Sequence, residues 1–194
     1  MITWIASYPK SGNTWVRALL SSYFFSDKGY FEFDLLKNIK QFPIKEHFEK
    51  FSSNFNNPVE TTNYWLAAQD KINLNKKMNF LKTHNAMCNI NGNIFTNKKN
   101  TAGCLYIVRD PRNVVLSIAH HYELTLSEAF EFITNKRKII FNSKNKNDFG
   151  DVQFLGDWSS HYRSWKETKN FPIKIIKYED LAKDTLAVFF SILN

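Results

Sequence analysis

The sequence has few cysteines and no long run of apolar residues. Its two cysteines, Cys88 and Cys104, form no CxxC pair, which argues against a zinc site or a disulfide framework and fits a reducing compartment. No apolar stretch approaches the roughly 20 residues of a transmembrane helix. No signal peptide precedes Ile2, which already belongs to a strand-like run. We therefore expect a cytoplasmic protein without a metal ion.

Acidic residues are also scarce, with 18 Asp and Glu against 26 Lys and Arg, which gives a net charge of +8. Such an excess favours an anionic partner, namely a nucleotide, a nucleic acid or a membrane surface, and solubility is an equally good explanation. The hydrophobic fraction of 43% is enough for an ordinary core, and 18 phenylalanines make that core aromatic. The length of 194 residues suits a single α/β domain over residues 1–194.

Short apolar runs alternate with helical patterns along the chain. Runs rich in Ile, Val, Leu or aromatic residues predict strands at 2–7, 79–84, 103–109 and 172–179. Apolar residues at helical spacing predict helices at 14–25, 33–41, 61–74, 111–122, 126–140, 156–168 and 180–193. This alternation predicts an α/β fold with a mostly parallel central sheet flanked by helices. Two Asn- and Lys-rich segments, 89–101 and 142–151, are predicted to be exposed loops.

The stretch "SYPKSGNTW" (7–15) lies between a predicted strand and a predicted helix. It is not a Walker A loop, because there the lysine follows the last glycine, and here Lys10 precedes Gly12. The physical parts are nevertheless the same: a glycine, the hydroxyl groups of Ser11 and Thr14, a helix N-terminus and a lysine. The stretch therefore predicts an anion site, with an ordinary capped turn as the alternative.

A second motif is "YIVRDPRNVVLSIAHHY" (106–122), in which a strand ends at Arg109 and a helix begins. Asp110 is a good N-cap residue and Pro111 a good first helical residue. Ser117 follows about two helical turns later. A guanidinium at the carboxyl end of a strand can bind a phosphate through two hydrogen bonds. A surface ion pair between Arg109 and Asp110 is the alternative.

The third motif, "FLKTHNA" (80–86), places Lys82 and His84 at the end of another strand. Histidine titrates near neutrality and can take a proton from a hydroxyl group, although a single histidine is more often structural. In a parallel sheet the carboxyl ends of the strands lie on one edge. We therefore expect Lys82 and His84 to converge with Lys10 and Arg109.

The motifs "YPKSGNTW", "KTH", "VRDPRNVVLS" and "KYEDL" (177–181), in this order, resemble the sulfotransferases that use 3′-phosphoadenosine 5′-phosphosulfate (PAPS). The similarity runs from residue 2 to about residue 184 and is weak between 30 and 78. The resemblance implies a P-loop-like three-layer sandwich and transfer of a sulfuryl group to a hydroxyl or amine of a small-molecule acceptor. The nucleotide product would be 3′-phosphoadenosine 5′-phosphate (PAP). Nucleic acid and membranes are not expected as partners.

By this resemblance, the first loop would hold the phosphosulfate with Lys10, Ser11, Gly12, Asn13 and Thr14. Trp15 would lie against the adenine, and Tyr178 would sit close to it. Arg109 and Ser117 would hold the 3′-phosphate. Asn13 stands where the family commonly has threonine, and its amide can still donate to a phosphate.

The resemblance also implies three catalytic roles. His84 would be the general base that deprotonates the acceptor. Lys10 would stabilise the leaving phosphate oxygen, and Lys82 would stabilise the sulfuryl group during transfer. Family members normally continue past the "YED" region with a basic, glycine-containing loop over the 3′-phosphate, and this sequence ends at Asn194 without one. Either the last helix closes the domain, or the sequence is a fragment of a longer chain that contains the loop. Affinity for the donor and activity depend on which alternative is correct.

Two other classes of function remain open. A small-molecule or nucleotide kinase is disfavoured, because no second Gly-Lys follows Gly12 and no strand ends in a clear magnesium-binding aspartate. A non-catalytic relative could hold nucleotide or RNA through the positive charge. Acceptor choice in the family depends on the loops between motifs, here mainly 26–78 and 123–155. Their aromatic residues suit an apolar or ring-bearing acceptor, or they belong to the core.

The remaining histidines and two aromatic residues are interpreted as surface, helix or core positions. These are His47, His120, His121, His161, Tyr162 and Trp165.

Overall fold

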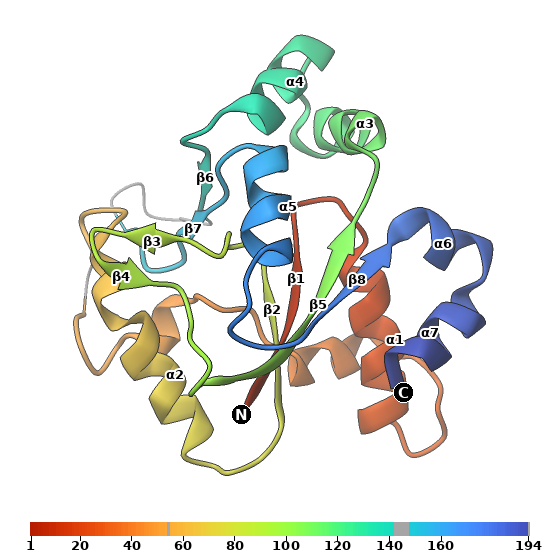
Figure 1. Cartoon of the computed structure of the whole chain (residues 1–194), viewed down its shortest axis with the longest axis horizontal. Coiled ribbons are helices and arrows are strands. Elements are labelled where there is room, and N and C mark those ends of the chain that lie inside the picture. Colours follow the sequence, from red (N-terminus) through yellow and green to blue (C-terminus); the bar gives the residue numbers. More distant parts are fainter. Residues whose placement is uncertain (54, 142–147, 194) are drawn as a thin grey trace.

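The computed structural model describes residues 1–53, 55–141 and 148–193. Its central sheet contains four parallel strands in the order β2-β1-β5-β8 (Figure 1). The strands are β1 (Ile2–Ser7), β2 (Asn79–Thr83), β5 (Thr101–Val108) and β8 (Ile173–Lys177). The predicted parallel sheet is confirmed.

In this register the carboxyl ends of the four strands lie side by side at one edge of the sheet. Ala6 pairs with both Thr83 and Tyr106, and Val108 pairs with Lys177. Each predicted motif directly follows one of these strand ends. One edge of the sheet therefore carries all four motifs.

Helices cover both faces of the sheet, which gives the predicted three layers (Figure 1). On one face, α1 (Asn13–Phe25), α6 (Tyr178–Lys183) and α7 (Thr185–Leu193) pack on inward-facing residues such as Ile5 and Ile107. The neighbouring strand positions face the other way, because side chains alternate along a strand.

The opposite face of the sheet packs against α2 (Trp65–Asn73) and α5 (Trp158–Lys166). Its core is aromatic and includes Trp4 and Tyr106 from the sheet and Trp165 from α5, all at most 1% exposed. The expected core position of Trp165 is confirmed. The abundant phenylalanine predicted from composition also contributes here.

Two helices stand beyond the carboxyl ends of the strands (Figure 1). They are α3 (Pro111–Tyr122) and α4 (Leu126–Thr134). The carboxylate of Asp110 accepts a hydrogen bond from the main chain of Arg112 and caps α3, as the sequence predicted. Thr125 and Glu128 form a capping box that starts α4. Both helices pack around a third cluster that includes the fully buried Leu155.

Short elements complete the chain. Three 3₁₀ helices are η1 (Phe33–Asn38), η2 (Lys45–His47) and η3 (Glu60–Tyr64), and two hairpins pair β3 (Asn89–Ile90) with β4 (Asn93–Ile94) and β6 (Ile139–Ile140) with β7 (Gln153–Phe154). The main chain at Phe42 donates to the carbonyl of Lys82 (2.8 Å), so residues 40–42 run along the free edge of β2. In the described part of the chain, no helix is both long enough and apolar enough to cross a bilayer.

Four predicted helices were wrong in extent. The one predicted at 61–74 begins as the 3₁₀ helix η3 and is α-helical only as α2. The helix predicted at 33–41 is the 3₁₀ helix η1, and the one predicted at 126–140 ends at Thr134. Asn135 ends it, because its side chain accepts from the main chain of Arg137 (2.8 Å) and thereby competes with helical hydrogen bonds. The helix predicted at 180–193 is broken at Asp184, whose carboxylate accepts from the main chain of Ala187 (2.9 Å).

Two predicted loops are not simply exposed. Segment 89–101 contains a hairpin, and its Phe95 is fully buried, with ring centroids 5.1 Å from Trp4 and 5.3 Å from Trp65. Of segment 142–151, residues 142–147 lie outside the described residues. In the rest of this segment, Gly150 is buried.

Candidate active site

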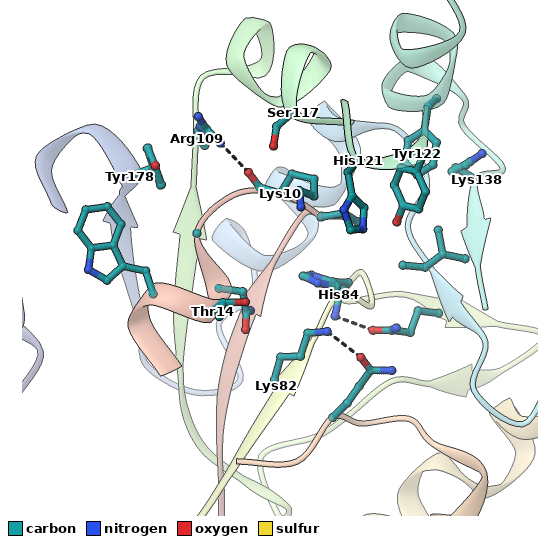
Figure 2. Close-up of a pocket in the computed structure, with 18 of the residues that line it drawn as sticks. Lys10, Thr14, Lys82, His84, Arg109, Ser117, His121, Tyr122, Lys138 and Tyr178 are labelled. Atoms are coloured by element: carbon teal, nitrogen blue, oxygen red, sulfur yellow. Dashed lines mark hydrogen bonds between the residues drawn. The ribbon is translucent and has the colours of Figure 1, made fainter. Parts of the chain in front are cut away.

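A pocket of about 910 Å³ opens at the edge of the sheet where the parallel strands end. Every predicted site residue except Ser11 lines it. Figure 2 shows Lys10, Lys82, His84 and Arg109 around one space, although they come from separate segments of the chain. The prediction that these strand ends converge is therefore confirmed.

The loop between β1 and α1 turns through two residues with a left-handed backbone. These are Lys10, with φ 65°, and Gly12, with φ 101°. Helix α1 begins at Asn13, and its N-cap residue, Gly12, has no side chain that could cap the first turn. The first N–H groups of a helix lack partners one turn earlier and can bind an anion, although that of Trp15 donates here to the carbonyl of Gly12 (3.0 Å).

Aromatic and cationic groups form one wall of the pocket beside this loop. A Cβ atom on Gly12 would lie 2.7 Å from Cδ2 of Tyr178, so the ring requires a glycine there. The Arg109 guanidinium lies over the same ring, 4.2 Å from its centroid, and donates to the carbonyl of Lys10 (3.1 Å). Trp15 meets the Tyr178 ring edge to face, with centroids 5.8 Å apart.

Two buried polar atoms lack a hydrogen-bond partner among the described residues: Nε of Arg109, in this wall, and Oγ of Ser11, behind it. A buried unsatisfied donor costs about 1–3 kcal/mol, and an anion can satisfy it. Ser11 is only 1% exposed, which is why it does not line the pocket. A phosphate-bearing ligand therefore fits the donor set at this end.

Asn13 is used differently from what its position in the motif predicts. Its side-chain amide donates to the carbonyl of Ile5 (2.9 Å) and to the hydroxyl of Ser7 (3.2 Å). Both amide hydrogens are directed into the fold, and the residue is 5% exposed. The side chain thus fixes the start of α1, and the expected donation from this amide to a phosphate has no support in its hydrogen bonds.

His84 is held in one tautomer by the end of β1. Its Nδ1 donates to the carbonyl of Ser7 (2.7 Å), and a carbonyl can only accept, so the proton resides on Nδ1. Burial and the nearby Lys82 ammonium lower the pKa of His84 well below its usual range, although the bond to Ser7 acts in the opposite direction. The ring is therefore neutral at pH 7, and Nε2 is free to accept a proton.

Two other residues fix the main chain of His84. The side-chain oxygen of Gln153 accepts from its N–H (2.8 Å), and Nε2 of His161 donates to its carbonyl (3.0 Å). His161 also accepts from the hydroxyl of Tyr106 through Nδ1 (2.8 Å), and it is fully buried. Burial lowers the pKa of His161 to about 4. The structural role expected of this histidine is confirmed.

Lys82 approaches the pocket from β2, and its ammonium donates to the side-chain oxygen of Gln41 (2.7 Å). Burial and the charge of Arg17 lower the pKa of Lys82 to about 8. Arg17 itself donates to the carbonyls of Leu36 (2.9 Å) and Ile39 (2.8 Å). These bonds hold the segment that carries Gln41 against the pocket.

The sequence interpretation missed the residues at the other end of the pocket. They are Gln41, His121, Tyr122, Phe132, Lys138, Ile139, Ile140, Phe141 and Gln153. A signal existed for His121, because it follows Ser117 by four positions and residues so spaced share a helix face. In the described ranges, no three His, Cys, Asp or Glu residues gather closely enough to hold a metal ion.

The parallel sheet flanked by helices, with the loop of β1 and α1 at its carboxyl edge, defines an α/β protein with a P-loop-like fold. The sequence profile of the sulfotransferase domain matches residues 2–192, and the chain belongs to this family. The resemblance stated from the motifs is therefore confirmed.

Curated relatives and solved structures agree with this assignment. The chain is 27% identical over 192 residues to luciferin sulfotransferase from Photinus pyralis, covering 95% of this chain and 48% of that protein. It is 34% identical over 90 residues to amine sulfotransferase from Oryctolagus cuniculus, covering 45% of this chain and 27% of that one. The chain thus spans about half the length, or less, of these relatives.

Two solved structures share the fold. A mouse sulfotransferase complexed with PAP gives a TM-score of 0.53 at 21% identity, covering 98% of this chain and 55% of the other. Retinol dehydratase in a complex with retinol and PAP gives a TM-score of 0.53 at 18% identity, covering 98% of this chain and 58% of the other.

Proposed function

We propose that this protein transfers a sulfuryl group from PAPS to a hydroxyl or amine of a small-molecule acceptor. One observation carries the proposal: a single pocket joins the loop at the start of α1 to His84, whose Nδ1 bonds to the carbonyl of Ser7 and so leaves Nε2 as the proton acceptor. Membership of the sulfotransferase family supports it. Cytoplasmic location and a metal-free reaction remain predictions.

The donor would lie along the wall that contains Arg109 and Tyr178. The main chain at the start of α1, with Lys10, would hold the phosphosulfate. Nε of Arg109, which has no partner among the described residues, would bind the 3′-phosphate together with Ser117 of α3. The rings of Trp15 and Tyr178 would take the adenine.

When bound, the donor supplies the sulfuryl group: its bond from sulfur to the 5′-phosphate oxygen breaks as a new bond to the acceptor oxygen or nitrogen forms, and PAP leaves. Nε2 of His84 would take the proton from the acceptor. Lys10 would stabilise the charge that grows on the leaving phosphate oxygen, and Lys82 would face the transferred group. Magnesium independence is expected, because this donor carries no triphosphate to neutralise.

The 3′-phosphate assignment is tested by comparing thermal stabilisation by PAP and by AMP. A ligand at about 100 times its dissociation constant adds about 2.7 kcal/mol of stability. PAP should stabilise the protein more than AMP, and Arg109→Met should remove most of that difference. Equal shifts with the two nucleotides would contradict the assignment. A larger shift with ATP and magnesium would favour a kinase.

The role of His84 is tested by His84→Ala, with transfer measured by mass spectrometry of the sulfated acceptor. Loss of a general base typically lowers the rate by about 10²–10⁴. PAP binding should be unchanged, because His84 is assigned to the acceptor proton. His120→Ala is the matched control, since His120 is exposed and does not line the pocket. Turnover near the wild-type rate in His84→Ala would show that this histidine is only structural.

A further inference from the structure

The end of the pocket away from Tyr178 is apolar except for a few polar groups. Figure 2 shows His121, Tyr122 and Lys138 on the side of His84 opposite Arg109 and Tyr178. The rest of this end is aromatic or aliphatic and consists of Phe132, Ile139, Ile140 and Phe141. Its size and composition suit a ring-bearing molecule next to His84.

Lys138 is the cation at this end of the pocket. Its ammonium lies over the ring of Phe132, 3.9 Å from the centroid, and Phe132 in turn stacks on Tyr122 with centroids 5.5 Å apart. Within residues 1–53, 55–141 and 148–193, no carboxylate forms an ion pair with Lys138. Burial lowers the pKa of Lys138, and the charge of Glu131 acts in the opposite direction. A half-buried cation without a bonded counter-ion is ready to take an anionic partner.

The position of Lys138 is fixed relative to that of His84. The carbonyl of Lys138 accepts from the main chain of Leu155 (2.9 Å) and of Gly156 (3.0 Å). The next residues form β6, which pairs with β7, and Gln153 of β7 accepts from the main chain of His84 (2.8 Å). One hairpin therefore positions both the cation and the candidate base.

The charged side chains that line the pocket, among the described residues, have one sign. Among the described residues that line it there is no Asp or Glu, while Lys10, Lys82, Arg109 and Lys138 are cationic. The first three are assigned to the donor, and Lys138 is left at the acceptor end. A protonated amine would meet no negative charge among the lining residues described, whereas a carboxylate would be attracted by Lys138.

We propose that the acceptor is an aromatic or similarly apolar molecule with a hydroxyl group at His84 and an anionic group, such as a carboxylate, bound by Lys138. This inference rests on the proposed sulfuryl transfer. The carboxylate does not react; it orients the acceptor so that its hydroxyl meets Nε2 of His84.

Three phenols of similar shape test the proposal: 3-(4-hydroxyphenyl)propionate, its uncharged propanamide and tyramine. Each is titrated calorimetrically into the full chain saturated with PAP, which cannot transfer a group, so affinity is measured without turnover. We expect the propionate to bind about tenfold or more tightly than the propanamide, as for a charge-assisted hydrogen bond, and tyramine to bind weakest.

Variants of Lys138 separate its charge from its packing. Lys138→Gln should weaken propionate binding by about tenfold and leave propanamide binding within about twofold. Lys138→Arg should keep the preference for the propionate, and Lys138→Glu should shift it toward tyramine. Lys136→Gln is the matched control, because Lys136 is exposed and does not line the pocket.

The outcomes distinguish this inference from the proposed function. If the propionate does not bind, binds no better than the propanamide, or keeps its advantage in Lys138→Gln, the inference is overturned. A weakened affinity for PAP in Lys138→Gln would also overturn it, because the lysine would then belong to the donor site. Transfer from PAPS is assayed separately with each phenol. A preference for the propionate that depends on Lys138, without transfer to any phenol, would support the anion site and refute sulfuryl transfer.

Discussion

Replacement of Gly12 by alanine tests how the anion loop and Tyr178 fit together. The glycine has φ 101°, and a Cβ atom there would lie 2.7 Å from Cδ2 of Tyr178, well inside van der Waals contact. The variant must adopt a strained backbone and also displace the ring. That ring carries the guanidinium of Arg109 on its face and contacts Trp15 at its edge.

The size of the effect follows from these contacts. A positive φ costs a residue other than glycine about 1–3 kcal/mol. A displaced ring would lose a cation–π contact worth about 0.5–1 kcal/mol and an aromatic pair worth about 0.5–1.5 kcal/mol. Gly29 offers a matched control, since it has φ 73° and nothing lies within 4 Å of its would-be Cβ. Gly12→Ala should therefore lower the free energy of unfolding by about 1–2.5 kcal/mol more than Gly29→Ala does.

Urea unfolding of both alanine variants, of Tyr178→Ala and of the double variant Gly12→Ala/Tyr178→Ala measures this coupling. Without the ring, the cost of Gly12→Ala should fall to that of Gly29→Ala. Calorimetry should also show weaker PAP binding to Gly12→Ala, because the displaced ring belongs to the donor wall. An unchanged cost of Gly12→Ala in the absence of the ring would refute the proposed contact.

Substitutions at Lys10, Arg109, Lys82 and His161 test the other parts of the site. Lys10→Met should lower kcat by about 10²–10³ with a smaller rise in the KM for PAPS, because the charge on the leaving oxygen grows only during transfer. Arg109→Met should mainly raise the KM for PAPS, because the 3′-phosphate that Arg109 would bind keeps the same charge throughout the reaction. The Lys82 pKa of about 8 predicts that kcat/KM falls as the pH rises through about 8, as the ammonium of the free enzyme is lost, and that Lys82→Met abolishes this step in the pH profile. His161→Phe should lower kcat without changing the KM for PAPS, because the bond to the carbonyl of His84 is lost, and His161→Gln should restore part of the rate; equal rates in both variants would contradict this positioning role.

The donor end of the site could be predicted because each part depends on short-range sequence. Strand β1 has the predicted bounds, and β2 ends one residue before the predicted end. Each strand is a short apolar run with polar residues at its carboxyl end, and a parallel sheet brings such ends to one edge. Lys10, His84 and Arg109 could therefore be placed together without knowledge of the rest of the fold.

The hydrogen bonds that tune these residues could not be predicted in the same way. The tautomer of His84 depends on the carbonyl of Ser7, 77 residues away in sequence. Asn13 has the right position to donate to a phosphate and instead bonds to the interior. In both cases the partner is a main-chain carbonyl, and every residue has one, so composition gives no signal.

The residues at the acceptor end of the pocket were not predicted from the sequence, for a related reason. Lys138 lies in a segment predicted as helix, where it would be one more surface lysine. It reaches the pocket because Asn135 ends α4 and the following residues pair with β7. This hairpin is joined to the end of β2 by hydrogen bonds from His84 to Gln153, from Ala86 to Phe154 and from Phe154 to Asn85, and these partners lie outside the loop around Gly12. Changes confined to the hairpin can therefore alter acceptor choice while the loop around Gly12 continues to bind the donor, because distant sites without shared partners contribute independently.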